Sequence, residues 1–184
     1  MEPSWGDRFR IHRAGPEPGL AEALASITRD CVEGGASIGF MAAPAPGRLE
    51  AFWRGALDSA ARGERIVLVA EEVASGRILG TVSLLLAMPD NQPHRAEIAK
   101  MQVHRDARRL GLGAALMRAA EAEARAAGRT LLVLDTVTGG DAERLYASLG
   151  WVRAGVIPDY ALWPDGRPCA TTLFYRDLRR DTGI

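Results

Sequence analysis

Residues 97–113 read EIAKMQVHRDARRLGLG, and they decide the fold. The first part is apolar, and rich enough in β-favouring residues, to predict a strand over Arg95–His104. Arg108 then begins the pattern Arg-x-x-Gly-x-Gly. From Leu112 onward the chain is rich in Ala and Leu with Glu and Arg between them, which is typical of a helix. The stretch therefore predicts a strand, a glycine turn and a helix N-terminus, in that order.

A glycine turn before a helix predicts an anion site, because the first N–H groups of a helix are unpaired and carry a partial positive charge. The dinucleotide pattern Gly-x-Gly-x-x-Gly is not met, since Leu116 occupies the position of its third glycine. No Gly-Lys-Ser/Thr follows to make a nucleotide P-loop. The turn thus favours a pyrophosphate, with Arg108 and Arg109 as basic partners. The alternative is an ordinary turn with an exposed arginine pair.

The composition indicates a globular chain without a strong charge preference. Of its 184 residues, 47% are hydrophobic and 25% charged, so we expect a single domain over residues 1–184. The 23 basic residues balance the 23 acidic ones, which argues against binding to nucleic acid or to an anionic membrane. Two cysteines and three scattered histidines predict neither a disulfide framework nor a metal site. Without a signal-peptide or membrane-helix pattern, we expect a cytoplasmic protein.

Hydrophobic periodicity and turn residues divide the rest of the chain into strands and helices. The expected strands are 9–13, 66–73, 78–88, 95–104, 131–137, 151–156 and 169–175. The expected helices are 20–33, 49–60, 111–127 and 141–149. Within this scheme Asp141 is a candidate N-cap, the run LLVLDTV at 131–137 predicts a strand buried on both faces, and 158–166 is expected to be a loop. Hairpins in the first half and a crossover helix in the second indicate an α/β fold.

The pattern at 108–113, with the strand before it and the helix after it, resembles the acyl-CoA loop of the GCN5-related N-acetyltransferases (GNAT). The order of the elements is similar to that family's fold over the full length. This resemblance implies a mixed sheet of seven strands with four flanking helices, in which strands 4 and 5 run parallel and splay apart. It also implies acetyl-CoA as co-substrate, with its pantetheine arm between those strands. The residues expected to bind it are Met101, Gln102, Val103, Arg108, Arg109, Leu110, Gly111, Leu112, Gly113 and Ala114.

Two carboxylates are candidates for the general base, which an amine nucleophile needs because free amines are mostly protonated at neutral pH. Glu97 lies between Ala96 and Ile98, where desolvation would favour its neutral form; the alternative is a surface glutamate. Asp135 interrupts LLVLDTV, and a carboxylate in a buried strand is rare unless it is paired or functional. A hydrogen-bonding role in the core is the alternative. If the two strands are neighbours, both carboxylates face one cleft and orient the cationic amine, with either as the base.

The resemblance also implies a residue that assists the departing thiolate. Residues 145–151, LYASLGW, match the family's Leu-Tyr-x-x-Leu-Gly-aromatic segment, whose tyrosine commonly protonates or hydrogen-bonds the sulfur of CoA. Here that tyrosine is Tyr146, and packing in the core is its alternative role. The amide of Val103 is a candidate donor to the oxyanion. One departure from the family is Gly139, at a position where an asparagine often contacts pantetheine.

Four segments resemble a narrower group, the tabtoxin-resistance and phosphinothricin-like acetyltransferases. They are GGASIGFM at 34–41, HRAEIAKMQV at 94–103, LLVLDT at 131–136 and IPDYALWPDGR at 157–167. Members of that group acetylate the α-amino group of an amino-acid-like toxin or antibiotic, which implies a role in resistance. By the same resemblance, Ser37, Phe40 and Tyr160 would shape the acceptor pocket.

The sequence therefore predicts an acetyl-CoA-dependent N-acetyltransferase that acts on a small-molecule amine by direct attack in a ternary complex. Cys31 and Cys169 are not favoured as acyl-carrying nucleophiles, because one belongs to a helix stripe and the other to a late strand. Two alternatives stay open: a CoA-binding sensor domain without turnover, and an acetyltransferase of protein N-termini or lysines. An exposed last strand would allow a homodimer.

Overall fold

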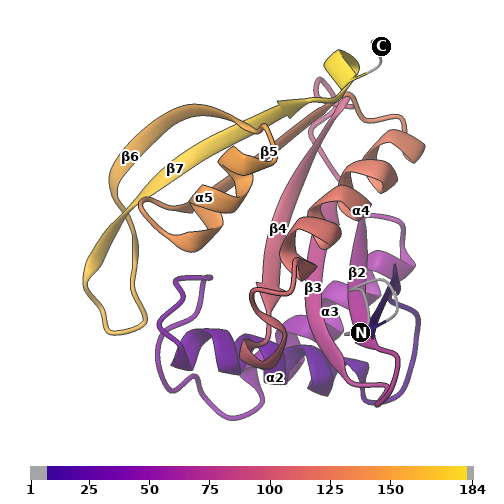
Figure 1. Ribbon diagram of the computed structural model, residues 1–184, viewed down its shortest axis with the longest axis vertical. Helices are drawn as coiled ribbons and strands as arrows, with labels where there is room; N and C mark the ends of the chain where they lie inside the picture. Colours follow the sequence, from indigo (N-terminus) through magenta and orange to yellow (C-terminus); the bar gives the residue numbers. More distant parts are fainter. Residues whose placement is uncertain (1–7, 182–184) are drawn as a thin grey trace.

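Strand β4 (Arg95–Val103) lies in the middle of a seven-stranded sheet in the computed structural model, which describes residues 8–181 (Figure 1). The strands follow the order β1-β2-β3-β4-β5-β7-β6. The pair β4 and β5 is parallel, whereas every other neighbouring pair is antiparallel. The expected α/β fold, a mixed sheet with parallel strands 4 and 5, is confirmed.

The observed elements agree with the expected ones in number and order. The other strands are β1 (Phe9–Arg13), β2 (Arg65–Glu72), β3 (Ile78–Leu85), β5 (Leu131–Val137), β6 (Val152–Leu162) and β7 (Pro168–Asp177). The α-helices in the described part of the chain are α2 (Leu20–Glu33), α3 (Arg48–Ala61), α4 (Leu112–Ala126) and α5 (Asp141–Ser148). Two short 3-10 helices, η1 (Arg105–Ala107) and η2 (Leu178–Asp181), follow β4 and β7.

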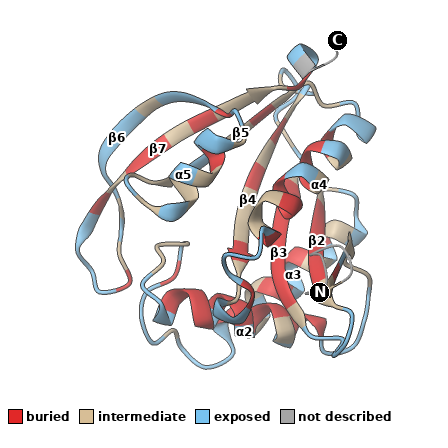
Figure 2. Ribbon diagram, viewed as in Figure 1, coloured by how far each residue is buried: buried red, intermediate tan, exposed pale blue. Residues whose placement is uncertain are grey.

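Helices cover both faces of the sheet. Val67 and Val69 of β2 pack with α2 and α3 on one face, which we call the α2–α3 face. Leu68 of the same strand, with Ile98 of β4 and Leu116 of α4, belongs to the larger cluster on the opposite face, which we call the α4 cluster. Side chains alternate between the two faces of a strand, so the continuous apolar run in β2 serves both clusters. Figure 2 shows the buried residues concentrated in the central strands and the inner sides of these helices.

The expectation that β5 is buried on both faces is wrong. Leu132 and Leu134 are buried in the α4 cluster, but Asp135, which points to the other face of β5, is exposed. The reason is that β5 pairs with β4 only from Leu131 to Val133, and the two strands then separate (Figure 1). Beyond that point the residues of β5 on the α2–α3 face are exposed or half-buried, whereas Val67 and Val69 of β2 are buried on it.

Two local expectations near the C-terminal half are also wrong. The segment 158–166 is not a loop throughout, because β6 continues to Leu162. Pro158 is tolerated there since β6 is an edge strand, and its pairing with β7 is irregular between Ile157 and Ala161. The N-cap of α5 is Gly140 rather than Asp141, which is the first helical residue and makes no capping hydrogen bond.

Candidate active site

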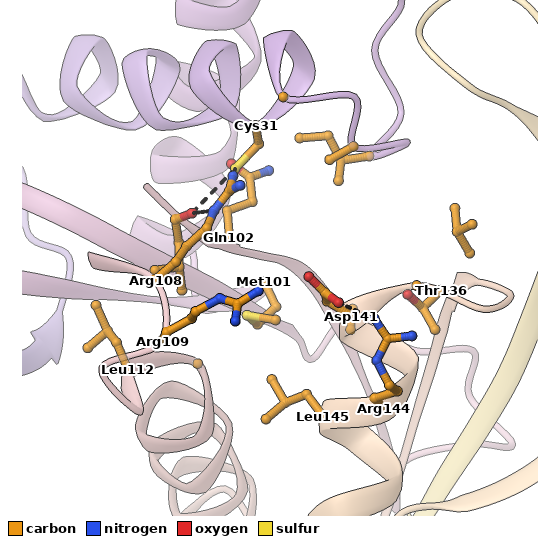
Figure 3. Close-up of a pocket in the computed structure, with 18 of the residues that line it drawn as sticks. Cys31, Met101, Gln102, Arg108, Arg109, Leu112, Thr136, Asp141, Arg144 and Leu145 are labelled. Carbon is orange, nitrogen blue, oxygen red and sulfur yellow. Dashed lines mark hydrogen bonds and ion pairs between the residues drawn. The ribbon is translucent and has the colours of Figure 1, made fainter. Parts of the chain in front are cut away.

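The separation of β4 from β5 opens a cavity of about 940 Å³ between them (Figure 3). Three parts of the chain meet there: the end of β4 with the turn after it, the C-terminal end of α2, and the end of β5 with α5. The expected cofactor-binding residues that line it are Met101, Gln102, Val103, Arg108, Arg109, Gly111, Leu112, Gly113 and Ala114. Leu110, also expected to bind, is exposed and does not line the cavity.

The end of β4 presents free backbone groups to this cavity. The amide of His104 donates to the carbonyl of Leu79 at 2.9 Å, and Val103 is the register partner of Gly80. In an antiparallel pair the hydrogen-bonded positions alternate, so the N–H and C=O of Val103 point away from β3. Its carbonyl accepts a hydrogen bond from Nε of Arg108 at 3.1 Å. The Val103 amide therefore remains available as a donor on the cavity side.

The N-terminus of α4 presents further free donors. Gly111, its N-cap, has φ 80°, a left-handed conformation that a residue with a Cβ adopts at a cost. No side chain caps the helix, and the first intrahelical bond runs from the amide of Ala115 to the carbonyl of Gly111. The amides of Leu112, Gly113 and Ala114 thus lack intrahelical partners. Together with the helix dipole, they make a suitable site for a phosphate anion.

The two arginines of the turn have different partners. Arg108 donates to Val103, lies 3.8 Å from Sγ of Cys31 and 3.7 Å from a carboxylate oxygen of Asp30, so it fastens the turn to α2. Arg109 has no hydrogen bond or ion pair with any described residue, and Figure 3 shows it extending into the cavity. Both arginines were expected to bind the pyrophosphate. Of the two, only Arg109 extends into the cavity without a partner among the described residues, so it is the better candidate.

Arg144 is a cavity residue that the sequence analysis missed. It lies on α5, across the cavity from Arg109, and its guanidinium binds the carboxylate of Asp141 (Figure 3). Nothing in the sequence pointed to it, because its position depends on how α5 lies against the end of β5. A second basic group in the cavity increases its suitability for a polyanionic ligand.

Cys31 lines the cavity as a thiol rather than as a thiolate. Burial raises the pKa of its side chain, although the nearby Arg108 acts in the opposite direction. A raised pKa keeps the sulfur protonated at neutral pH, and a protonated thiol is a weak nucleophile. This agrees with the expectation that Cys31 does not carry the acyl group.

Glu97 and Asp135 lie on the same face of the sheet, next to the point where the strands separate. Glu97 is the register partner of Val133, and Asp135 is two residues further along β5, so both point to the α2–α3 face. Glu97 is half-buried, with its carboxylate 3.6 Å from Arg95, while Asp135 is exposed. The apolar surroundings expected from their neighbours in the sequence are wrong, because the apolar neighbours Ala96, Ile98 and Leu134 point to the opposite face of the sheet.

Tyr146 is buried on α5, as either of its expected roles requires. Its ring centroid lies 6.1 Å from those of Trp151 and Phe174. Burial raises the pKa of Tyr146 above its ordinary value, and the charge of Asp135 raises it further. The phenol is therefore protonated at neutral pH and can donate, and no described residue hydrogen-bonds to its hydroxyl group.

A second cavity, of about 370 Å³, adjoins the first and contains two of the three expected acceptor residues. Ser37 and Phe40 line it, whereas Tyr160 lies exposed on β6 and lines neither cavity. The loop that forms this cavity is held against the β6–β7 hairpin. Oγ of Ser37 donates to the carbonyl of Leu162 at 2.7 Å, and the amide of Ala42 donates to that of Pro164 at 3.0 Å.

Lys100 is a second residue that the sequence analysis missed. Two residues of β4, Lys100 and Met101, oppose one residue of β3, and this bulge gives Lys100 a φ of 51°. Its ammonium lies 5.8 Å from the ring centroid of Phe40 and 5.6 Å from that of Phe52, on the α2–α3 face. Burial lowers the pKa of Lys100; the charge of Asp135 acts against this and that of Arg65 adds to it. The sequence signal that could have identified Lys100 is a charged lysine within the largely apolar strand segment IAKMQV.

Residues 8–181 contain neither a candidate metal site nor a candidate membrane-spanning helix. No group of three or more His, Cys, Asp or Glu side chains there has the arrangement of a metal site. None of the helices in that range has both the length and the apolar character needed to cross a membrane.

Comparison with known proteins identifies the family. The model of the acetyltransferase (GNAT) family matches residues 26–151. Among solved structures, yncA from Salmonella typhimurium, a proposed acetyltransferase with its cofactor acetyl-CoA, is 25% identical, with a TM-score of 0.74 over 92% of this chain and 94% of that one.

Two further structures share the fold at lower identity. The ribosomal-protein-alanine N-acetyltransferase from Brucella melitensis is 24% identical, with a TM-score of 0.74 over 92% of this chain and 99% of that one. A proposed phosphinothricin N-acetyltransferase is 19% identical, with a TM-score of 0.74 over 92% and 98%. The family match covers more than half of the chain and the cavity has the donors that a CoA pyrophosphate needs. This protein belongs to the GNAT acetyltransferase family and is an acyltransferase that uses acetyl-CoA as co-substrate.

Proposed function

We propose that this acetyltransferase transfers the acetyl group directly to the amine of a small, amino-acid-like acceptor. The observation that carries the proposal is that Glu97 and Asp135 share one face where β4 and β5 separate. Neither carboxylate lines either of the two cavities, but Lys100 on the same face lies 5.8 Å from the ring of Phe40, which lines the second cavity. Two carboxylates there would attract a cationic amine and accept its proton. Such an acceptor would be a toxin or antibiotic, and we propose that the chain acts as one catalytic domain in the cytoplasm.

Acetyl-CoA would bind through groups that lack other partners. The amides of Leu112 to Ala114 and the guanidinium of Arg109 would hold the pyrophosphate. The free edge of β4 at Met101 and Val103 would pair with the pantetheine arm. The thioester supplies the activated acetyl group, and the Val103 amide would donate to its carbonyl oxygen as negative charge develops there.

Proton transfer falls to three side chains. Either Glu97 or Asp135 would remove the proton that makes the amine a nucleophile. Tyr146, whose raised pKa keeps it protonated, would donate a hydrogen bond or a proton to the departing sulfur. Because the amine attacks the thioester itself, no acylated residue of the enzyme is needed.

The size of the acceptor is inferred from the second cavity. Its volume of about 370 Å³ is in the range of small-molecule sites. The hydrogen bonds of Ser37 and Ala42 hold the loop of this cavity against the β6–β7 hairpin, whereas a protein substrate would need an open groove there. These contacts favour a small molecule over a protein N-terminus.

Thiol release from acetyl-CoA, measured against amino acids, toxin-like amino-acid analogues, polyamines, aminoglycosides and short peptides, tests the proposal. We expect turnover with amino-acid-like amines, and a loss of about 100-fold in kcat in Glu97→Gln or Asp135→Asn. The variant that lacks the base loses the acidic limb of the pH–rate profile. Asp58→Asn, at an exposed carboxylate on α3, is the control with unchanged kcat.

Two outcomes would overturn the proposal. Turnover of peptides but not amino acids would favour a protein acceptor. Tight binding of acetyl-CoA without turnover of any amine would favour a sensor domain.

A further inference from the structure

The side chain of Lys100 is half-buried on the α2–α3 face, next to the rings of Phe40 and Phe52. Among the residues that the structure describes, none accepts a hydrogen bond from it or forms an ion pair with it. A lysine ammonium has three donors, and burying them without acceptors is unfavourable. The left-handed φ of 51° adds backbone strain, which is retained mainly where a function requires it. Lys100 is therefore held in an unfavourable position by the structure around it.

The aromatic rings around Lys100 attract its positive charge but do not accept conventional hydrogen bonds from its N–H groups. The rings of Phe40 and Phe52 lie within 6 Å of Nζ, a distance at which their π-faces attract a positive charge. Gly39 leaves room for the ammonium, since a Cβ at that position would lie 3.2 Å from Nζ. Gly39 and Phe40 both line the 370 Å³ cavity. Lys100 does not line it, but its ammonium group lies next to these two residues of the proposed acceptor site.

Two groups of opposite charge, the ammonium of Lys100 and the carboxylate of Asp135, lie on this face. Lys100 and Asp135 both point to the α2–α3 face, on the two strands that separate, and each lies within electrostatic range of the other. Arg65, on the same face of β2, adds further positive charge near Lys100. A molecule with an ammonium at Asp135 and an anionic group at Lys100 would match both charges.

We propose that Lys100 binds a carboxylate of the acceptor, and that the acceptor is therefore a zwitterionic amino acid or a close analogue rather than a simple amine. This inference rests on the proposed function, because it assigns a specificity residue to the same acceptor site. The carboxylate supplies the acceptors that the ammonium lacks, in surroundings where charge-assisted hydrogen bonds are strong. Its binding also fixes the amine relative to the thioester.

A structural role is the competing explanation, in which Lys100 only balances the charge of Asp135. Comparing an amino acid with its α-amide separates the two, since the amide keeps the amine and side chain but loses the negative charge. The amide also changes the basicity of the amine. The informative quantity is therefore the change in the acid-to-amide ratio of kcat/KM between the wild type and a variant.

We expect Lys100→Met to lower this ratio by about 100-fold, mainly through KM for the amino acid, because a charge-assisted hydrogen bond is lost. Lys100→Arg keeps the charge and should retain most of the ratio. Arg54→Met removes an exposed basic residue of α3 that forms an ion pair with the exposed Glu22, and it should leave the ratio unchanged. The affinity for acetyl-CoA reports that each variant is folded.

Other results would contradict the proposed role of Lys100. A ratio in Lys100→Met equal to that of the wild type would assign Lys100 a structural role and overturn the inference. If Lys100→Met does not fold, inhibition of the wild type by N-acetyl amino acids and by their amides gives the same comparison, and equal inhibition would overturn it. A wild type that acetylates amino-acid amides but no free amino acid contradicts the role of Lys100, while transfer to an amino-acid-like amine, the proposed function, is left intact. A wild type that acetylates no amine contradicts both.

Discussion

Arg108 and Arg109 are neighbours in the sequence, but the structure gives them different tasks. Arg108 fastens the glycine turn to α2, whereas Arg109 extends freely into the cavity. We expect Arg109→Met to weaken acetyl-CoA binding about 10-fold, because one charge-assisted contact to the pyrophosphate is lost. Thermal unfolding should stay unchanged. Calorimetric titration with acetyl-CoA and a melting curve measure the two effects.

Arg108→Met is the matched control for this prediction. It removes contacts within the protein, so we expect it to lower the melting temperature. An Arg109→Met variant that binds acetyl-CoA as tightly as the wild type would contradict the assignment of Arg109 to the pyrophosphate.

At the residue scale, the sequence identified the two carboxylates but not their surroundings. The alternation of side chains along a strand correctly predicts that Glu97 and Asp135 share a face once their strands are neighbours. Whether that face is covered depends on where the strands separate, which no local pattern contains. Lys100 was missed for a related reason, because its direction is set by a bulge against β3.

At the scale of elements, α2 is connected to the turn after β4 by one buried carboxylate. Asp30 accepts hydrogen bonds from the backbone amide of Arg105, at 3.0 Å, and from its side chain. Burial acts to raise the pKa of Asp30, but the hydrogen bonds from Arg105 and the nearby His104 outweigh it, so the pKa is lowered. This carboxylate therefore stabilises the folded state more when it is ionised.

We expect Asp30→Asn to lower the free energy of unfolding by about 1–3 kcal/mol at neutral pH. A lowered folded-state pKa means that this stabilisation is complete above the ordinary aspartate pKa, about 3.9, and is lost as the pH falls below it. The difference between wild type and variant should therefore shrink in acid. Urea denaturation at neutral and acidic pH measures it, with Asp58→Asn as an exposed control. A difference that grows in acid would contradict the assignment.

The elements that the sequence predicted well are those with strong local signals. The turn at 108–113 and the start of α4 follow from glycine chemistry and helix periodicity, and both are observed. The full length of β6 was not predicted, since Pro158 is a local signal for a loop. An edge strand tolerates it because only one side of the strand needs to pair.

At the scale of the whole molecule, the order of the elements indicated an α/β fold, and the resemblance to the GNAT family predicted the mixed sheet and its parallel pair. Contacts between segments that are distant in the chain were harder to predict from the sequence. The 36–47 loop is held by Ser37 and Ala42 to the β6–β7 hairpin, more than 100 residues away in the chain, and both residues line the 370 Å³ cavity. The resemblance assigned both segments to one pocket, but neither carries a residue pattern that predicts these hydrogen bonds.

The central claim is that the acetyl group passes straight from acetyl-CoA to an amine bound between β4 and β5. The most direct test is the initial rate of thiol release, with acetyl-CoA varied at several fixed concentrations of an accepted amine, together with the mass of the enzyme after exposure to acetyl-CoA alone. We predict intersecting double-reciprocal lines and an enzyme of unchanged mass. Parallel lines, with an enzyme heavier by one acetyl group, would contradict the account.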